Sequence, residues 1–273
     1  MTPTLASESV AVPVSLRTLA PDEKRTLVQR LFSGIAPRYD WFNRLASCGL
    51  DQHWRRTALR RAGVAPGQRV LDACTGTGDL ALLCAGQLQG RGVVLGADMN
   101  RDMLMRANAK GAKAGRRLHP STRADALAQD AAPRDAPAGL HWLQADAQAL
   151  PFSAASFDRV LIGFSTRNLS DLAAGLREMV RVLKPGGRLV ILETGYPSHP
   201  VLRAGYQLFL FTVARAIGFL LTGKAWPFTY LARPVRQFLT PAQMIACLQR
   251  VETRVEYIPI SCGLASLYIA TKP

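Results

Sequence analysis

The stretch VLDACTGTGDL, residues 70–80, decides the fold. The apolar residues before Asp72 predict a buried strand, Gly76 and Gly78 predict a tight turn, and Asp79 begins an apolar helical run. A strand, a tight turn and a helix N-terminus in succession bring backbone N–H groups against a ligand. Glycine permits a close approach of the backbone to that ligand because it has no Cβ atom.

Working outward, the chain alternates short apolar runs with amphipathic helices. This order predicts an α/β fold with an open, mostly parallel sheet and helices on both faces. Ligands of such sheets lie beyond the carboxyl ends of the strands. The residues expected at those ends are Asp72, Asp98, Asp146, Gly163 and Glu193.

Further elements follow from the same periodicity. A helix over 172–183 is expected to stop at the sequence KPGG, residues 184–187, and a strand is expected over 188–195. Thr240 followed by Pro241 predicts an N-cap and a helix to Gln249. Two closing strands are expected over 255–260 and 264–270. Most of the aromatic residues between Phe32 and Arg56 are expected to pack on the core from a pair of helices.

The chain has 273 residues and a formal net charge of +15, because 34 lysines and arginines outnumber 19 aspartates and glutamates. This balance favours an anionic partner or simply a basic surface. Nucleic acid is disfavoured, since the chain has no N-P-P-Y motif and no platform of aromatic and basic residues. The five cysteines form no C-x-x-C pair and the four histidines are scattered, so we expect no metal site and a reducing cytoplasm.

One domain is expected over 21–273, after a flexible tail at 1–20 that has no features of a signal peptide. Within it we expect a helical lid over 21–62 and a cofactor-binding core over 68–194. Residues 115–139, rich in Ala, Arg, Asp and Pro, predict a mobile insertion. Residues 195–240 predict an apolar segment that faces substrate or membrane.

The apolar run Ala204–Gly223 approaches the ~20 residues that span a bilayer. Arg215 lies near its centre, where a charge costs roughly 2.5–3.5 kcal/mol on insertion scales. The sequence therefore favours a helix that covers the core or lies on a membrane surface, and both alternatives stay open.

Two cofactors compete for the glycine turn. A dinucleotide places its pyrophosphate at the helix N-terminus, where Asp79 would repel it. S-adenosylmethionine has no phosphate, and its ammonium and sulfonium groups would be attracted by Asp72 and Asp79. The residues therefore favour S-adenosylmethionine.

Several motifs resemble those of class I S-adenosylmethionine-dependent methyltransferases, and within them the ubiquinone/menaquinone C-methyltransferase family. The matching pieces between Phe32 and Glu193 are FSGIAPRYDWFN, VLDACTGTGDLA, QADAQALPF, FDRVLIGFSTRNL and REMVRVLKPGGRLVILE. The resemblance implies the Rossmann-like, seven-stranded sheet of that class. It also implies the cofactor contacts: Gly76, Thr77 and Gly78 at the methionine part, Asp98 with Met99 at the ribose, Asp146 and Ala147 at the adenine, and Gly163 near the transferred methyl group.

The resemblance further implies C-methylation of a polyprenyl benzoquinol or naphthoquinol ring. Arg167 would stabilise the developing phenolate, Asn168 would orient it, and Tyr39 and Asp40 would belong to the lid. An apolar helix after Tyr206 would guide the polyprenyl tail. Basic residues would add roughly 1 kcal/mol each of attraction to an anionic leaflet, which predicts a cytoplasmic protein that contacts the inner face of the membrane.

Departures from the family pattern leave alternatives open. Gly163 stands where the pattern usually has Ser, LETGYPSHP replaces a typical L-E-F-S-K-P, and Pro234 replaces a Ser. The alternatives are a class I methyltransferase for another lipid or small molecule, such as a phospholipid amine or a sterol, and a non-catalytic subunit that binds lipid or cofactor. A homodimer or a quinone-synthesis complex is also left open.

Overall fold

The computed structural model describes residues 20–114, 139–195, 197, 199–213, 216–217, 219 and 239–273. The predicted tail and insertion lie outside the described residues except at their borders. The same holds for Arg215 and for the end of the predicted apolar run.

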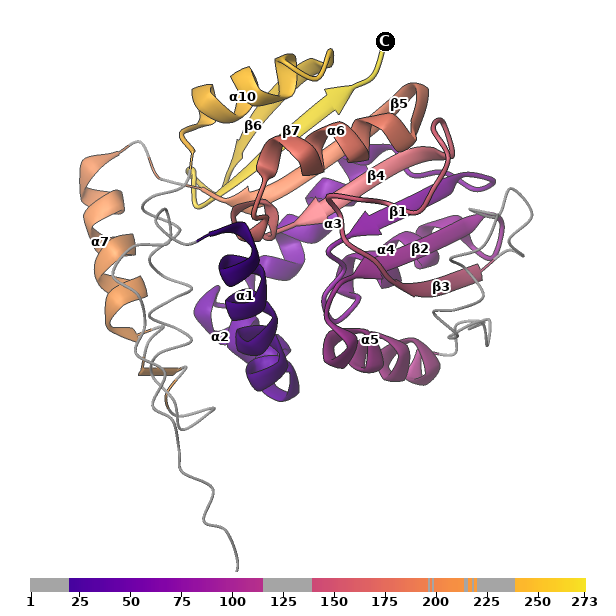
Figure 1. The fold of residues 1–273 in the computed structure, drawn as a ribbon. Coiled ribbons are helices and arrows are strands. Elements are labelled where there is room, and N and C mark those ends of the chain that lie inside the picture. Colours follow the sequence, from indigo (N-terminus) through magenta and orange to yellow (C-terminus); the bar gives the residue numbers. More distant parts are fainter. Residues whose placement is uncertain are drawn as a thin grey trace, which may run out of the picture.

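A seven-stranded sheet forms the centre of the molecule, with the strand order β3-β2-β1-β4-β5-β7-β6 (Figure 1). All neighbouring strands are parallel except for β7, which pairs antiparallel with β5 and β6. The predicted fold class is confirmed. The strands are β1 (Arg69–Ala73), β2 (Val93–Asp98), β3 (Gly139–Gln144), β4 (Phe157–Gly163), β5 (Leu183–Thr194), β6 (Arg254–Ile260) and β7 (Ala265–Thr271).

The strand order reverses between β1 and β4, because β1 continues to β2 on one side and β4 continues to β5 on the other. At such a switch point the helices leave the two strands toward opposite faces and open a crevice beyond the carboxyl ends. The fold therefore places a ligand site next to the glycine turn that follows β1.

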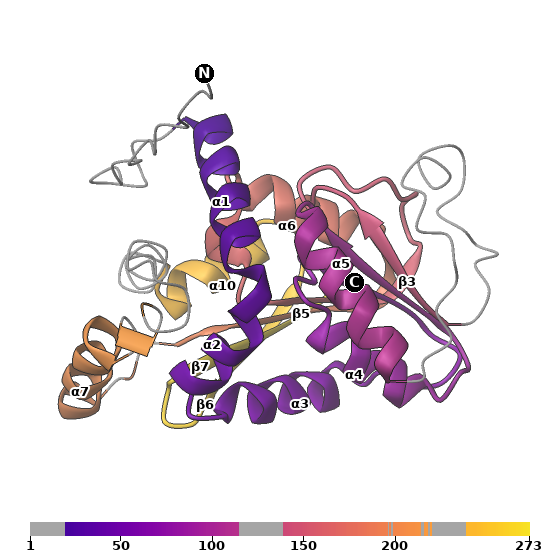
Figure 2. The ribbon, with the colours of Figure 1, turned by 90° about the horizontal axis from the view of Figure 1, so that it is seen from below.

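Helices cover both faces of the sheet (Figure 1). One face packs on α3, α4 and α5, and the other on α6 and α10. Three more helices, α1, α2 and α7, lie to the side of the carboxyl ends (Figure 2). The helices are α1 (Pro21–Ile35), α2 (Tyr39–Ala46), α3 (Leu50–Ala62), α4 (Asp79–Leu88), α5 (Arg101–Lys113), α6 (Leu172–Val182), α7 (Pro200–Phe211) and α10 (Pro241–Gln249), with 3-10 turns η2 (Ala36–Arg38) and η3 (Thr166–Asn168).

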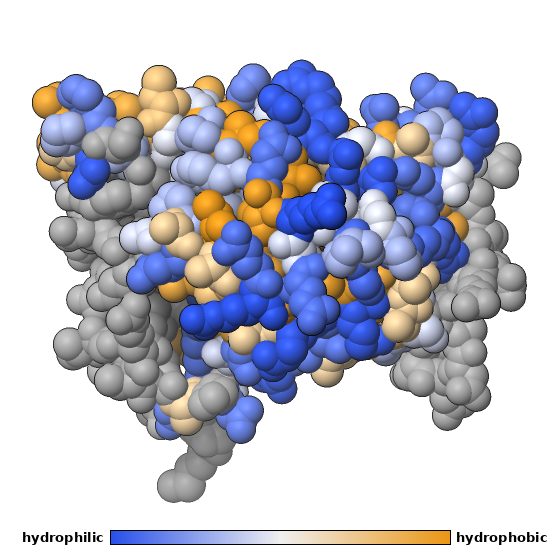
Figure 3. Space-filling view, turned by 90° about the horizontal axis from the view of Figure 1, so that it is seen from above, coloured by the Kyte–Doolittle hydropathy of each residue, from blue (hydrophilic) through white to orange (hydrophobic). Residues whose placement is uncertain are grey.

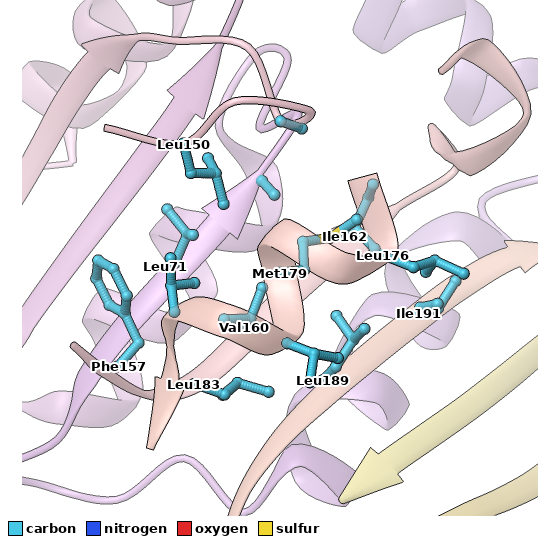
Figure 4. Packing of buried hydrophobic residues seen from close by; sticks show 14 of the residues in the cluster. Leu71, Leu150, Phe157, Val160, Ile162, Leu176, Met179, Leu183, Leu189 and Ile191 are labelled. Atoms are coloured by element: carbon cyan, nitrogen blue, oxygen red, sulfur yellow. The ribbon is translucent and has the colours of Figure 1, made fainter. Parts of the chain in front are cut away.

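The core between the sheet and α6 consists of branched side chains from neighbouring strands (Figure 4). Val160 and Ile162 of β4 meet Leu176 and Met179 of α6, while Leu161 of β4 lies in the core on the opposite face. A strand buried on both faces explains the unbroken apolar run in the sequence. Each fully buried side chain of this size contributes about 1.5–3 kcal/mol relative to exposure.

The boundary between α6 and β5 differs from the prediction. Helix α6 ends at Val182 as expected, but β5 begins at once with Leu183, which pairs with Phe157. The next pair is Arg159 with Arg188, so the predicted stop at residues 184–187 is a bulge inside the strand. The predicted strand is present, but it begins at Leu183 and not at Arg188, because Pro and Gly also occur in bulges.

The aromatic residues of the lid do not share one environment. Trp54 of α3 packs in the core beneath the sheet, whereas Trp41 of α2 is 67% exposed. Trp41 is thus an exception among the aromatic residues that were expected, for the most part, to pack on the core, since α2 packs on α1 and turns its other side to solvent.

The face seen from above is mostly hydrophilic, with apolar side chains showing between charged ones (Figure 3). Helix α7 carries several exposed apolar residues, among them Val201, Leu202 and Leu208. Among the described residues, no helix has the length and apolar character that a membrane crossing needs.

Candidate functional site: two cavities that share a wall

The glycine turn after β1 is shaped by left-handed backbone. Cys74, Gly76 and Gly78 have φ values of 53°, 57° and 82°. A Cβ on Gly78 would lie 2.5 Å from a ring carbon of Trp142, so this glycine lets β3 and α5 pack closely against the start of α4. Gly76 has free space around its Cα and lines a cavity. The two predicted glycines therefore differ. Gly76 lines the cavity, whereas Gly78 allows close packing against Trp142 and Ala107.

Asp72 lies behind this turn and not in the cavity wall. Its carboxylate accepts hydrogen bonds from the Thr75 hydroxyl at 2.6 Å and from the Ala81 N–H at 3.0 Å. Burial raises the pKa of Asp72 to about 7, although the hydrogen bond from Thr75 and the charge of Arg55 oppose the rise. Asp72 therefore stabilises the turn through these two hydrogen bonds and lies outside the cavity lining, whereas the sequence predicted a contact with the cofactor.

The first cavity lies beyond the carboxyl ends of β1, β2 and β4 and encloses about 900 Å³, including the part open to solvent. Helix α1 covers it with Arg25, Val28, Gln29 and Phe32. Most of the predicted cofactor residues meet in its wall. These are Gly76, Thr77, Asp98, Met99, Asp146, Ala147 and Gly163, together with Tyr39 and Asn168.

Asp98 ends β2 and lies at the centre of this wall. Its carboxylate accepts the N–H groups of Gly76 and Asn100, both at 2.8 Å. Burial raises the pKa of Asp98, while these backbone hydrogen bonds lower it. The side chain is thus fixed in position at the strand end, as an acceptor for ribose hydroxyls requires.

Asp146 follows β3 and makes an ion pair with Arg25 of α1. Its other oxygen accepts the N–H of Gln148 at 2.9 Å. The ion pair joins the lid helix to the sheet over the cavity. The sequence gives no signal for Arg25, because its partner lies 121 positions away and no local pattern connects the two.

A network of charges lies beside the turn. Asp40 of α2 accepts the Thr77 hydroxyl at 2.5 Å and the Lys110 ammonium at 2.9 Å, and Lys110 also pairs with Asp79. Burial raises the pKa of Asp79, but the nearby charges of Arg55 and Lys110 outweigh it and hold the pKa below the ordinary value. Asp79 therefore lines the first cavity as a carboxylate whose charge is balanced by Arg55 and Lys110. Asp40 lies in neither cavity wall.

The second cavity is larger, about 1580 Å³ in the same measure, and lies between α2, α3 and α7. Its wall is mostly apolar. The apolar and aromatic lining residues are Phe42, Ala46, Leu50, Trp54, Phe164, Val201, Leu202, Phe209 and Leu264. Polar groups in the wall include those of Arg167, Thr194 and Tyr206.

Arg167 and Asn168 lie in η3, after β4, and face different cavities. Arg167 lines the second cavity and pairs with Glu193, which also accepts the Thr166 hydroxyl at 2.6 Å. Asn168 lines the first cavity, and its Oδ1 is buried without a hydrogen-bond partner among the described residues. The pair that the sequence treated as one unit therefore bridges the two spaces.

Tyr39 and Arg55 line both cavities and form the wall between them. Burial raises the pKa of Tyr39, while a hydrogen bond with Asn43 and the charges of Arg55 and Arg167 lower it. Sequence analysis predicted Tyr39 but missed Arg55. The spacing of Asp51 and Arg55, four apart on one helix, was the available signal, but it also fits a plain surface ion pair.

The first cavity fits S-adenosylmethionine by its own chemistry. Gly76 leaves room for close contact, Asp98 offers an acceptor at a strand end, and α1 closes the space. Three polar atoms of its wall lack hydrogen-bond partners among the described residues: Arg25 Nε, Arg55 Nε and Asn168 Oδ1. A polar ligand with both donors and acceptors would satisfy them.

Comparison with known proteins agrees with this chemistry. Residues 19–272 match the model of the ubiE/COQ5 methyltransferase family. The chain is 34% identical to a ubiquinone/menaquinone biosynthesis C-methyltransferase UbiE of Shewanella woodyi over 92% of this chain and 93% of that protein. It is 35% identical to a demethylmenaquinone methyltransferase of Deinococcus radiodurans over 92% of this chain and 94% of that protein.

Solved structures share the fold. A magnesium protoporphyrin IX methyltransferase of Synechocystis with bound SAH matches with a TM-score of 0.58 at 16% identity, over 92% of this chain and 100% of that one. A SAM-dependent methyltransferase of Aquifex aeolicus matches with a TM-score of 0.57 at 16% identity, over 94% of this chain and 100% of that one.

Proposed function

Because the chain belongs to the ubiE/COQ5 methyltransferase family and is an S-adenosylmethionine-dependent methyltransferase, we propose that it methylates a ring carbon of a polyprenyl benzoquinol or naphthoquinol. The observation that carries the proposal is the wall shared by the two cavities at Tyr39 and Arg55. A methyl donor in one cavity and an aromatic ring in the other would meet there, as direct transfer requires.

In the first cavity, Asp98 would accept the ribose hydroxyls and Asp146 with Ala147 would border the adenine. Gly76 and Thr77 would hold the amino-acid end, and Gly163 would leave space beside the methyl group. When bound, S-adenosylmethionine supplies an electrophilic methyl group attached to a sulfonium sulfur. Asn168 Oδ1 is buried and has no partner within the part of the chain that the structure describes, so it would be available to orient a donor group of the cofactor.

In the second cavity, Phe42, Trp54 and Phe164 would hold the acceptor ring between apolar surfaces and exclude water. Arg167 would donate a hydrogen bond to the ring hydroxyl and favour its ionised form. Its guanidinium is fixed by Glu193 and Thr194, and its Nε has no partner among the described residues. Since arginine stays protonated, it would stabilise the anion and leave removal of the proton to water.

Helix α7 supports a polyprenyl acceptor. Leu202 and Phe209 line the second cavity, and Val201 both lines it and is largely exposed. Leu208 lies outside the cavity wall and is largely exposed, so apolar surface continues from the cavity to the outside. We propose that this surface contacts an anionic membrane, with the excess of basic residues adding attraction. Assembly as a homodimer or in a quinone-synthesis complex stays a prediction.

The test is methyl transfer by the purified protein from radiolabelled S-adenosylmethionine to a ring-demethylated quinol carrying a short prenyl tail. Label should enter the ring, and Arg167→Met should lower kcat while binding of the cofactor product is retained. A matched control is Arg56→Met, an exposed arginine on α3 outside both cavity walls. Label in neither quinol class, with the cofactor bound, would reject the proposed acceptor.

A further inference from the structure

Arg55 lies on α3 where the two cavities meet. The residue is 7% exposed, and its Nε has no hydrogen-bond partner among the described residues. A buried guanidinium donor without a partner is costly, because it has lost water and gained nothing in exchange. In a cavity wall, such a donor indicates a ligand that supplies the acceptor.

Two carboxylates compensate the charge of Arg55 without accepting its Nε–H. The distances from Nε are 3.7 Å to an oxygen of Asp51 and 3.9 Å to an oxygen of Asp79, both beyond hydrogen-bond length. Each carboxylate receives hydrogen bonds from other donors: Asp51 from the Ser47 hydroxyl at 3.2 Å, and Asp79 from Lys110. The donor of Arg55 therefore stays available.

The guanidinium is also held in orientation. Its central carbon lies 5.1 Å from the centre of the Phe164 ring, within the range of a cation–π contact. Its Nη1 lies 3.5 Å from the position that a Cβ on Gly163 would take. Arg55 is thus fixed against the carboxyl end of β4, and a ligand would find it already in place.

Other cations near the junction differ from Arg55. Lys110 pairs with Asp40 and Asp79. Arg167 pairs with Glu193 through Nη1 and also has a buried Nε without a partner among the described residues, but it lines only the second cavity. Tyr39 stands beside Arg55 as a neutral hydroxyl, since burial raises its pKa. Among these groups, Arg55 combines position in both walls with an unused donor.

We propose that Arg55 is an oxyanion-binding residue at the junction of the two cavities. Two ligand groups, one in each cavity, carry a negatively charged oxygen of this kind. From the first cavity it is the carboxylate of the amino-acid end of S-adenosylmethionine. From the second it is the ionised ring hydroxyl of the acceptor, whose proton passes to water; this second source rests on the proposed function.

Binding measurements on the full chain test this without methyl transfer. Calorimetry compares S-adenosylhomocysteine with its analogue that lacks the carboxyl group. A nitrophenol with a short alkyl tail, whose ionised form absorbs visible light, reports its own pKa when bound. For Arg55→Met we expect a roughly 10- to 100-fold loss of affinity for the oxyanion that Arg55 binds, as follows from a charged hydrogen bond. Arg55→Lys should recover most of it.

The control is Arg56→Met, which removes the same charge from the exposed face of the same helix and should change neither readout. If Arg55→Met loses affinity for S-adenosylhomocysteine but not for the analogue without the carboxyl group, Arg55 binds the cofactor carboxylate. If the pKa of the bound nitrophenol is higher in Arg55→Met than in the unaltered protein, Arg55 binds the ionised hydroxyl of the acceptor. Unchanged values of both in Arg55→Met overturn the proposal; if that variant does not fold, Arg55→Gln is read in the same way. If ligand binding depends on Arg55 but the protein methylates no quinol, the proposed function is wrong and the proposal for Arg55 stands.

Discussion

The buried carboxylate of Asp72 predicts a specific dependence of stability on pH. Burial raises its pKa from 3.8 to about 7 in the folded protein. A folded state that binds the proton more tightly is most stable when the group is protonated, so this contribution is present in full below pH 4 and is lost as pH rises toward 7. A rise of about 3 pKa units corresponds to about 4 kcal/mol at 1.36 kcal/mol per unit.

Asp72→Asn should remove that loss. An amide oxygen can accept the same hydrogen bonds from Thr75 and Ala81, so the turn should keep its shape. Relative to Asp72→Asn, the free energy of unfolding of the unaltered protein should fall by about 1.4 kcal/mol per pH unit between roughly pH 4 and 7.

Urea unfolding at several pH values, read by circular dichroism, measures the difference between the two proteins. Asp102→Asn serves as control, since Asp102 is an exposed carboxylate in the first turn of α5. Equal slopes for Asp72→Asn and the unaltered protein would refute the reasoning. Affinity for S-adenosylhomocysteine at pH 8 should change little in Asp72→Asn, because Asp72 lies outside the cavity wall; a loss above tenfold would return Asp72 to the cofactor site.

Three further predictions concern packing, the acceptor cavity and the outer surface. Gly78→Ala should lower the free energy of unfolding in urea by more than about 2 kcal/mol, since a Cβ would lie 2.5 Å from Trp142 at a φ of +82°. Glu193→Gln should cost about 3–5 kcal/mol by the same measurement, because Arg167 would lose its buried countercharge. Leu208→Asp, at a site 65% exposed, should leave stability within about 0.5 kcal/mol but weaken flotation with anionic liposomes; unchanged flotation would contradict membrane contact by α7.

The sheet and the cofactor half of the site could be predicted because their signals are local. The glycine turn, the strand that ends at Asp98 and the cap at Thr240 each lie within a few residues of the structure that they specify. The parallel topology then brings the strand ends together without further information. Asp98, Asp146 and Gly163 therefore line one cavity as the strand pattern implied.

The charges of the site could not be predicted in this way. The sequence predicted that Asp72 and Asp79 both attract the cofactor. Asp79 lines the first cavity, but Lys110, which lies 31 positions away on α5, already pairs with it. Asp72 lies outside that wall and accepts the N–H of Ala81 in the helix that follows the turn. Whether a carboxylate faces a ligand or a neighbouring side chain depends on packing between elements, which no short pattern reports.

The second cavity combines residues at the ends of β4 and β5, such as Phe164 and Thr194, with segments that no strand pattern places. Residues 39–55 supply Tyr39, Trp54 and Arg55, and α7 supplies Tyr206 and Phe209. Among the described contacts between these segments and the glycine turn, the hydrogen bond from Thr77 to Asp40 joins α2 directly to the wall of the first cavity. A ligand that moves Thr77 must therefore change either this bond or the position of α2, and α2 also lines the acceptor cavity. We therefore expect cofactor binding to be coupled to the shape of the second cavity through α2. Substitutions at Asp40 should alter the KM for the acceptor, although Asp40 lies in neither cavity wall.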